Sequence, residues 1–427
     1  MRNNPARIYD RDLKKILEQY LKTPEILAIK GPRQVGKTTL MQDLYQDLVD
    51  KNKCKFLSFE KRSDLEIFEK DIEAFKTLYV EKKEFVFIDE FQYARNGGQK
   101  LKYLFDTTKT KFIISGSSSL ELTQQTGKYL VGRLFSFYLY PFSFAEYLSV
   151  HGPDLLKLID VDRKKFASFL NGESKTIPVM KNFESEALKK QIGDLLQDYV
   201  IFGGYPRVIT AKTRAEKLKV LSSILQTYLL KDIKTLLELA SDEELLTLSK
   251  ALALQIGNLI EYKELGDIAS LSYLSLKKHL NILKQTFIAD FIKPYYKNKR
   301  TEMIKNPKVY SMDLGIRNSL IDNFNPLLER TDKGELLENF VYTSLLKTEK
   351  QIKFWRTKSQ AEVDFVLEKD GKPIPIEVKF KRDVIGKSLY SFIEKYKPKI
   401  AIVVTWDQSK RVKIGQTEVY FTPAYYL

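Results

Sequence analysis

The sequence predicts a multidomain α/β protein. Its 427 residues suffice for about two to four domains at the usual size of roughly 150 residues. Through the first third of the chain, apolar runs of strand length alternate with segments of helical periodicity, an order typical of a parallel sheet covered by helices. Beyond Pro326, a helix and several further strand-like segments predict a smaller α/β domain.

Composition narrows the class of protein. The chain is 43% hydrophobic and 30% charged, an ordinary balance for a soluble globular protein. Lys and Arg total 71 against 55 Asp and Glu, and the net charge of +16 favours polyanionic partners, with nucleic acid before an acidic membrane surface. A single cysteine excludes a disulfide framework and a multi-cysteine zinc site, and two histidines leave little material for histidine-based metal or triad chemistry. Without a signal peptide or a membrane-length apolar run, we expect a cytoplasmic protein with no membrane insertion.

The strongest motif follows the apolar run Ile26–Ile29, which predicts a buried strand. The next residues match G-x-x-x-x-G-K-[ST], and apolar residues then recur at helical spacing, the context expected of a phosphate-binding loop. Lys37 would contact the β and γ phosphates of ATP, and the Thr38 hydroxyl would bind Mg²⁺. The predicted nucleotide-binding residues of the loop are Gly31, Pro32, Arg33, Gln34, Val35, Gly36, Lys37, Thr38 and Thr39.

Acidic residues end a second predicted strand. The apolar segment Phe85–Ile88 is followed directly by Asp89 and Glu90. Asp89 would hold the Mg²⁺, and Glu90 would polarise the water that attacks the γ-phosphate. A third apolar strand ends at Ser115, and either Ser115 or Ser117 would sense the γ-phosphate, with a plain turn as the alternative.

With these motifs the first domain resembles the AAA-type ATPases, the P-loop class with an additional strand and a paired Asp-Glu. More narrowly, the chain resembles a prokaryotic family in which an ATPase domain is fused to a C-terminal domain of unknown function. The resemblance rests on the segments GPRQVGKTT, FVFIDEFQ, IISGSSS, YLVGRLFSFYLYPFSFAEYL and FGGYP. It implies an ATP-hydrolysing domain with Mg²⁺ as cofactor, and a helical lid after it fits this family.

Arg133, which follows Gly132 within the long family segment, is the candidate arginine finger or sensor arginine. A finger stabilises charge on the phosphoryl group and comes from the same or a neighbouring subunit, and the latter requires a homo-oligomer. The alternative is an ordinary surface ion pair. Further on, Gly203-Gly204 before Tyr205 predicts a turn between domains.

Residues 241–325 predict a winged helix-turn-helix, because three helical segments precede two strand-like ones. From Lys284 to Lys308, seven Lys or Arg accompany two acidic residues, as in a wing that contacts DNA phosphates. A solvated hairpin tip or a protein-docking module is the alternative.

The last domain carries a second candidate site. Glu377 and Lys379 lie two apart on one strand and therefore point to the same face, and a hairpin brings Asp364 beside them. Carboxylates gathered in this way favour a Mg²⁺ that activates water, with Lys379 stabilising charge. Glu338, on the preceding helix, would add a third acidic ligand.

This constellation resembles the PD-(D/E)XK core of restriction-endonuclease-like enzymes, except that no Pro precedes Asp364. The resemblance implies metal-dependent cleavage of DNA. Two alternatives are an exposed hairpin with paired charges and a nuclease fold that has lost catalysis.

The domains are therefore expected at 1–150 (P-loop ATPase), 151–240 (helical lid and linker), 241–325 (winged helix) and 326–427 (nuclease-like). We expect a Mg²⁺-dependent ATPase associated with DNA, whose C-terminal domain is a candidate DNA nuclease. The alternative is an ATP-controlled switch that binds DNA or a protein partner through the winged helix, with a non-catalytic nuclease-like domain.

Overall fold

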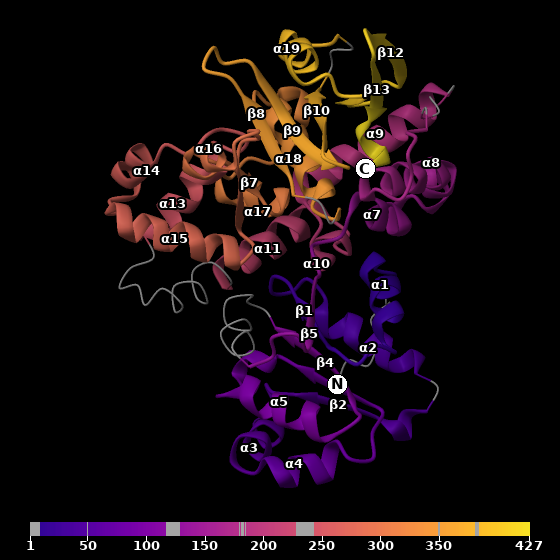
Figure 1. Ribbon diagram of the computed structural model, residues 1–427, viewed down its shortest axis with the longest axis vertical. Helices are drawn as coiled ribbons and strands as arrows, with labels where there is room; N and C mark the ends of the chain where they lie inside the picture. Colours follow the sequence, from indigo (N-terminus) through magenta and orange to yellow (C-terminus); the bar gives the residue numbers. More distant parts are fainter. Residues whose placement is uncertain are drawn as a thin grey trace. The chain divides into compact units, whose positions relative to one another are not determined.

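The computed structural model describes residues 9–48, 50–116, 129–178, 180, 183, 185–227, 243–348, 351–380 and 384–427 (Figure 1). The chain divides into two compact units. One comprises the described residues up to Phe142 together with Gln285–Phe287, and the other comprises those of Ser143–Lys284 and Ile288–Leu427. Ser117, one of the two candidate phosphate sensors, lies outside the described residues. Within the described ranges, no helix has both the length and the apolar composition that crossing a bilayer requires.

The first unit is built on a five-stranded parallel sheet with the strand order β2-β3-β4-β1-β5, which confirms the predicted parallel α/β sheet. The strand β4 lies between β1 and β3, as in the additional-strand class. The elements are α1 (Asp12–Tyr20), β1 (Ile26–Lys30), α2 (Lys37–Asp47), β2 (Cys54–Ser58), α3 (Arg62–Lys70), α4 (Ile72–Tyr79), β3 (Phe85–Asp89), α5 (Gly97–Thr107), β4 (Lys111–Gly116) and β5 (Leu134–Tyr138).

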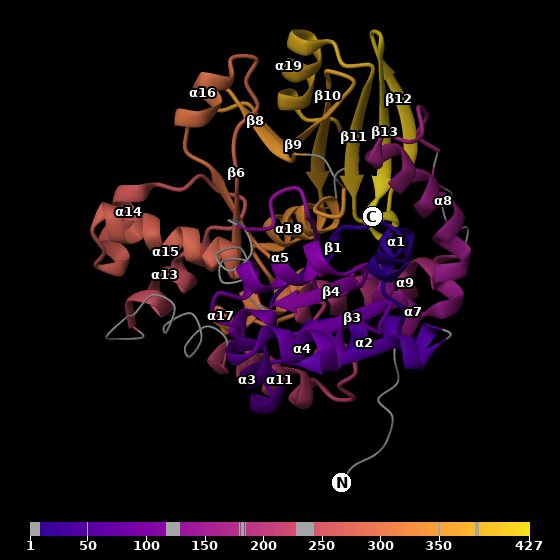
Figure 2. The ribbon, with the colours of Figure 1, turned by 60° about the horizontal axis from the view of Figure 1, so that its bottom comes forward.

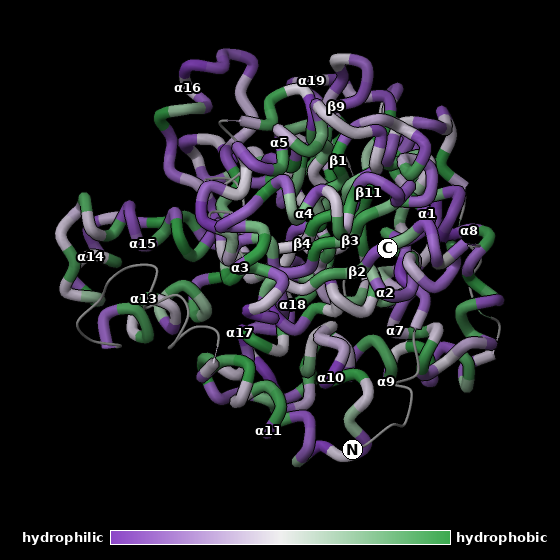
Figure 3. Tube along the Cα trace, turned by 90° about the horizontal axis from the view of Figure 1, so that it is seen from below, coloured by the Kyte–Doolittle hydropathy of each residue, from purple (hydrophilic) through white to green (hydrophobic). Residues whose placement is uncertain are grey.

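Both faces of this sheet are covered, which explains the unbroken apolar runs in the sequence. Along β1, Ile26 and Ala28 belong to the core formed with α3, α4 and α5, whereas Leu27 and Ile29 belong to the core formed with α1 and α2. Figure 3 shows β3 and β4 as hydrophobic strands. The sheet therefore holds the carboxyl ends of its strands, where the site residues lie, on a rigid support.

The second unit begins with helices and continues with three helices and a two-stranded antiparallel sheet, β6 and β7. This order of elements between residues 243 and 311 agrees with the expected one, although the loop between the two strands also contains the short helix α16. The elements are α7 (Phe144–His151), α8 (Pro153–Asn171), α9 (Glu186–Phe202), α10 (Pro206–Ile209), α11 (Arg214–Leu225), α13 (Glu243–Leu254), α14 (Tyr262–Ala269), α15 (Tyr273–Gln285), β6 (Ala289–Ile292), α16 (Lys299–Ile304), β7 (Lys308–Ser311) and α17 (Leu314–Leu320).

The same unit ends in a six-stranded mixed sheet with the order β12-β13-β11-β10-β9-β8. Helix α19 joins the parallel strands β10 and β11, and α18 packs against β10 (Figures 1 and 2). The elements are α18 (Lys333–Leu345), β8 (Lys353–Arg356), β9 (Glu362–Lys369), β10 (Lys372–Lys379), α19 (Lys387–Tyr396), β11 (Ile400–Thr405), β12 (Lys410–Ile414) and β13 (Thr417–Pro423).

The turn predicted between domains at Gly203-Gly204 is wrong as a domain boundary. Gly203 ends α9 with a φ of 76°, and the Gly204 N–H donates to Asp313 Oδ2 at 2.8 Å. Both partners belong to the second unit, and the neighbouring Tyr205 is 1% exposed. The two glycines allow close packing against Asp313 instead of forming a hinge.

Candidate functional site

The phosphate-binding loop joins β1 to α2, as predicted. Two of its residues adopt left-handed backbone conformations, Gln34 with a φ of 59° and Gly36 with a φ of 98°. At Gly31, an added Cβ would meet the Leu139 carbonyl oxygen at 2.2 Å, so a side chain does not fit there. The loop therefore depends on a glycine at its start, where the segment that follows β5 passes closely.

Thr38 and Asp89 lie opposite each other at the carboxyl ends of the strands. Thr38 Oγ1 donates to Asp89 Oδ2 at 2.7 Å, and the Ser115 hydroxyl donates to the other carboxylate oxygen, Oδ1. Asp89 and Ser115 are both buried. Hydroxyl and carboxylate oxygens are the ligands that Mg²⁺ prefers, so Thr38 and Asp89 fit the predicted cation.

Glu90 is held by backbone conformation as well as by hydrogen bonds. Its φ of 55° is left-handed, an uncommon conformation for a residue other than glycine. Its N–H donates to Ser115 Oγ at 3.1 Å, and Gln92 Nε2 donates to its carboxylate. Ser115 thus links Asp89 to Glu90, and the structure brings together the acidic pair and the candidate sensor named from the sequence.

Lys37 is buried beneath the loop. Its ammonium donates to the carbonyl oxygens of Gly31 at 3.0 Å and Pro32 at 2.9 Å. Burial lowers the pKa of Lys37 to about 8, although Glu90 and Asp89 act in the opposite direction. A bound phosphate would place negative charge beside this amine. That charge favours the protonated form of Lys37, which a phosphate-binding lysine requires.

Three hydrogen bonds around the loop were missed by sequence reasoning. Arg11 donates to the Val35 carbonyl at 3.0 Å and to the Tyr140 carbonyl at 2.6 Å, so it supports the loop from outside the motif. Arg33 Nη2 donates to Tyr93 OH at 3.4 Å. No pattern in the sequence marks Arg11, because its partners are backbone atoms far along the chain.

Arg133 lies away from the phosphate loop of its own sheet. Its carbonyl accepts from the Ile26 N–H, at the amino end of β1, whereas the loop follows the carboxyl end. The five residues of β1 span roughly 17 Å at about 3.3 Å per residue. The Arg133 guanidinium donates to Asp106 Oδ1 at 2.9 Å, the ordinary ion pair named as the alternative. A finger role in the same subunit is therefore wrong for this conformation, and the role in a neighbouring subunit stays a prediction.

The predicted residues of the second site meet at the end of the hairpin β9–β10. Asp364 Oδ2 accepts from the Val378 N–H at 2.7 Å, between Glu377 and Lys379. Lys379 Nζ lies 2.8 Å from Glu377 Oε1, so these two residues form an ion pair on one face of β10. Burial, and next the charge of Glu338, raise the pKa of Asp364 above its ordinary value, whereas the charge of Lys308 acts in the opposite direction.

The structure adds two residues from β7 that the sequence did not indicate. Lys308 Nζ lies 3.2 Å from Glu338 Oε1 and forms an ion pair with Glu362, and the Lys308 side chain is 1% exposed. Tyr310 OH donates to the same Glu338 oxygen at 2.6 Å. Burial by itself would lower the pKa of Lys308, but Glu338, Asp364 and Glu362 raise it above its ordinary value. Lys308 is therefore a charged ammonium among carboxylates.

The carboxylates of the second candidate site, in the C-terminal domain, are poorly arranged to bind a divalent cation. Among the residues that the structure describes, no set of three or more His, Cys, Asp or Glu side chains is arranged to hold a metal ion. Glu338, predicted as a ligand, is engaged by Lys308 and Tyr310, and Glu377 is engaged by Lys379. The chain itself supplies the positive charges that the carboxylates require.

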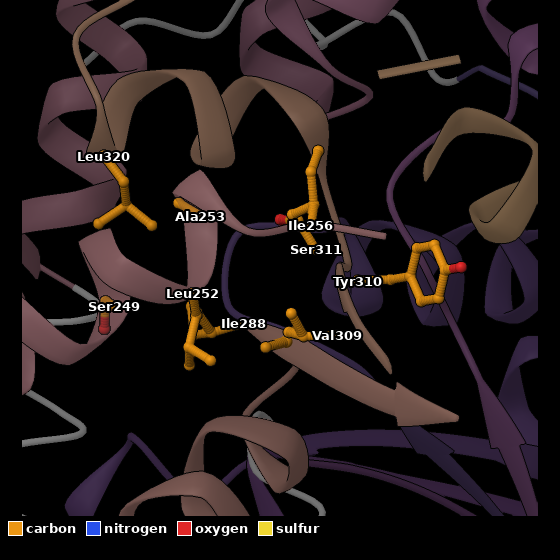
Figure 4. A pocket seen from close by; sticks show the side chains of 10 residues that line it. Ser249, Leu252, Ala253, Ile256, Ile288, Val309, Tyr310, Ser311 and Leu320 are labelled. Carbon is orange, nitrogen blue, oxygen red and sulfur yellow. The ribbon is translucent and has the colours of Figure 1, made fainter. Parts of the chain in front are cut away.

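A pocket lies beside β7 and is lined in part by Val309, Tyr310 and Ser311 of that strand (Figure 4). The Tyr310 ring points away from the other lining side chains, consistent with its hydrogen bond to Glu338. The pocket is lined by Ser249, Leu252, Ala253, Ile256, Ile288, Ala289, Val309, Tyr310, Ser311 and Leu320. This mostly apolar lining carries no carboxylate and shares Tyr310 with the second candidate site.

Two uncharacterised proteins are similar to this chain over most of its length. An uncharacterised protein of Haemophilus influenzae is 24% identical over 381 residues, which cover 85% of this chain and 84% of that protein. A second uncharacterised protein, from Methanocaldococcus jannaschii, is 23% identical over 385 residues, covering 86% and 78%.

Among solved structures, the Aeropyrum pernix ORC1 protein in complex with DNA has a TM-score of 0.30 and 11% identity, with 75% of this chain and 94% of that chain covered. AMPPCP-bound DnaA from Aquifex aeolicus has a TM-score of 0.27 and 11% identity, with 63% and 86% covered.

Family models divide the chain into three matched regions. Residues 23–148 match an AAA domain, which contains the phosphate loop, Asp89, Glu90 and Ser115. Residues 193–327 match a domain of unknown function (DUF8612), and residues 333–426 match another (DUF4143). The chain is therefore a multidomain α/β protein with an AAA domain of the P-loop ATPase class, followed by two domains of unknown function.

Proposed function

We propose that the protein is a Mg²⁺-dependent ATPase that acts on DNA. The observation that carries the ATPase activity is the connected group Thr38, Asp89, Ser115 and Glu90 beside the phosphate loop. Thr38 and Asp89 would hold Mg²⁺, which neutralises charge on the phosphates when bound. Glu90 would orient and polarise the attacking water, and Lys37 would contact the β and γ phosphates.

Phosphate release with saturating ATP and Mg²⁺ tests this activity. Lys37→Ala is expected to remove nucleotide binding, and Glu90→Gln to remove hydrolysis while binding remains. Lys102→Ala on α5, a lysine outside the loop, serves as the control. Hydrolysis by Glu90→Gln at the wild-type rate would contradict the assigned base.

The DNA association is proposed for the exposed face of α15. Lys277 and Lys278 are exposed there, beside Tyr273 at 54% exposure, while Leu276 and His279 face the core. The Lys277 ammonium lies 4.6 Å from the centre of the Tyr273 ring. Helix α15 follows a short turn and exposes lysines beside an aromatic ring. This arrangement is typical of a helix that contacts nucleic acid.

Binding to labelled duplex DNA, measured by fluorescence anisotropy at several salt concentrations, tests this surface. Lys277→Ala and Lys278→Ala are each expected to weaken binding and to reduce the salt slope by about 1, as loss of one phosphate contact does. Lys250→Ala is the matched control, since Lys250 is an exposed lysine on α13 of the same region. An equal loss in Lys250→Ala would mean that α15 is not the contact surface.

A second candidate function is metal-dependent cleavage of DNA by the C-terminal domain. The observation in its favour is the position of Asp364 against the Glu377–Lys379 segment of β10. Supercoiled and linear DNA would be incubated with Mg²⁺ or Mn²⁺, with and without ATP, using wild type, Asp364→Ala and Lys37→Ala. Cleavage lost in Asp364→Ala would establish a nuclease. No cleavage, with ATP hydrolysis intact, would favour an ATP-controlled switch.

A further inference from the structure

We propose that Lys308 is a built-in cation that takes the place of a divalent metal ion in the acidic cluster of the C-terminal sheet. The acidic cluster consists of Glu338, Glu362 and Asp364. The Lys308 ammonium bridges the first two, at 3.2 Å from Glu338 Oε1 and in an ion pair with Glu362 Oε1. The inference deepens the second candidate function and rests on its site, but not on cleavage by it.

The backbone of β7 fixes the position of the lysine. Side chains two apart on a strand share a face, so Lys308 and Tyr310 both reach Glu338. Around them, Ile260 N donates to the Pro307 carbonyl at 2.8 Å, and β7 pairs with β6. The lysine therefore projects from a hydrogen-bonded strand and not from a loose loop.

Charge explains why the lysine stays in the cluster. Carboxylates buried near one another repel unless a cation or a proton relieves them. With its side chain 1% exposed, Lys308 in turn needs anionic partners, since a buried unpaired ammonium is strongly disfavoured. Each side compensates the other: Lys308 pairs with Glu338 Oε1 and with Glu362 Oε1, and Asp364 Oδ2 accepts from the Val378 N–H.

The lysine and the cluster belong to different matched regions. Lys308 lies in the region of residues 193–327, whereas Glu338, Glu362 and Asp364 lie in that of residues 333–426. One domain of unknown function thus neutralises the acidic cluster of the next. In this arrangement the C-terminal domain holds its fold without a divalent cation, and metal entry requires that β7 withdraw its lysine.

Mn²⁺ binding to the full-length, nucleotide-free protein, followed by electron paramagnetic resonance, tests the proposal. We compare wild type with Lys308→Met, which keeps the length of the side chain and removes its charge. Lys353→Met is the matched control, because Lys353 is a buried lysine on β8 that pairs with Glu302, outside the acidic cluster. The phosphate-loop site is common to all variants and gives the same background.

We expect Lys308→Met to bind one more Mn²⁺ than wild type or Lys353→Met, and Mn²⁺ to raise the melting temperature of Lys308→Met alone. Adding Glu338→Gln to Lys308→Met should remove the new site. Equal Mn²⁺ binding by wild type and Lys308→Met would overturn the proposal, as would a wild-type Mn²⁺ site that Glu338→Gln abolishes. If Lys308→Met unfolds, failure of Mn²⁺ to restore its melting transition also overturns it. Neither ATP hydrolysis nor DNA cleavage is a readout, so these outcomes are independent of the proposed function.

Discussion

Thr38 Oγ1 donates a hydrogen bond to Asp89 Oδ2 across 2.7 Å, although the two residues are 51 positions apart. The contact joins the first turn of α2 to the carboxyl end of β3. The parallel sheet makes it, because β1 and β3 deliver their following residues to the same edge. The two oxygen atoms that we propose as Mg²⁺ ligands therefore lie together.

Removing the Thr38 hydroxyl tests this pair. We expect Thr38→Ala to lower the rate of Mg²⁺-dependent ATP hydrolysis by about 100-fold to 1,000-fold, the usual effect of losing one group that stabilises the transition state. Thr38→Ser, which keeps the hydroxyl, should retain most of the activity. Phosphate release as a function of Mg²⁺ concentration measures both, and equal rates for the two variants would contradict a ligand role.

Glu90→Gln should separate binding from chemistry. The amide keeps the shape of the side chain but cannot accept the proton of the water, so the hydrolysis rate should fall by about 100-fold to 10,000-fold. The dissociation constant for a fluorescent ATP analogue should change little, because Glu90 is not part of the phosphate loop. Loss of nucleotide binding in this variant would show that Glu90 maintains the structure of the site instead.

Gly31→Ala should disrupt the loop by steric overlap. The added Cβ would lie 2.2 Å from the Leu139 carbonyl oxygen, so the backbone must move, at a cost of about 1–3 kcal/mol in the free energy of unfolding. Gly334→Ala on α18 is the contrasting change, since its Cβ meets no atom within 4 Å and alanine favours a helix by up to about 1 kcal/mol. Urea unfolding, with nucleotide binding measured in parallel, distinguishes them. A Gly31→Ala protein as stable as wild type would refute the close approach.

Asp332 should make the stability of the second unit sensitive to acid. Burial alone would raise its pKa, but hydrogen bonds from Arg330 and Arg317 lower it to about 2 from its ordinary 3.8. Because the folded pKa is the lower one, the stabilisation is complete above about pH 5 and is lost as the pH falls through 2. It amounts to about 2 kcal/mol at 1.36 kcal/mol per pH unit.

Asp332→Asn checks this prediction. The variant should be less stable than wild type at pH 6 by about 2 kcal/mol or more, since two buried guanidinium groups lose their carboxylate. The difference should shrink as the pH falls through 2, where the wild-type carboxyl becomes protonated as well. Urea midpoints at both pH values give the measurement. A difference that does not depend on pH would mean that packing, and not charge, explains the loss.

Sequence reasoning succeeded where a site is built from residues that follow apolar strands. The loop motif after β1, and Asp89 and Glu90 after β3, could be placed because the carboxyl ends of parallel strands share one edge. The hairpin that brings Asp364 to Val378 could be predicted from the alternation of apolar and polar residues and from the turn that contains a glycine. The winged-helix and nuclease-like domains and the α15 contact surface stay predictions.

It failed where a contact depends on the distance between elements far apart in the chain. A Gly-Arg pair ahead of an aromatic strand cannot reveal that Arg133 precedes β5, at the amino ends of the strands, whereas the phosphate loop follows the carboxyl end of β1. Likewise, Gly203-Gly204 has the composition of a hinge, and only the neighbouring Asp313 shows that the turn is packed within the second unit.

Short motifs and strand-length apolar runs predict the AAA domain and its parallel sheet, and they single out the residues that we propose to hold ATP and Mg²⁺. Which charges meet, in contrast, depends on the tertiary structure. Lys308 stands 30 positions before Glu338 and 54 before Glu362, and nothing local links them. Electrostatic pairing inside a protein depends on distance and burial, which β7 and the C-terminal sheet create only by packing together.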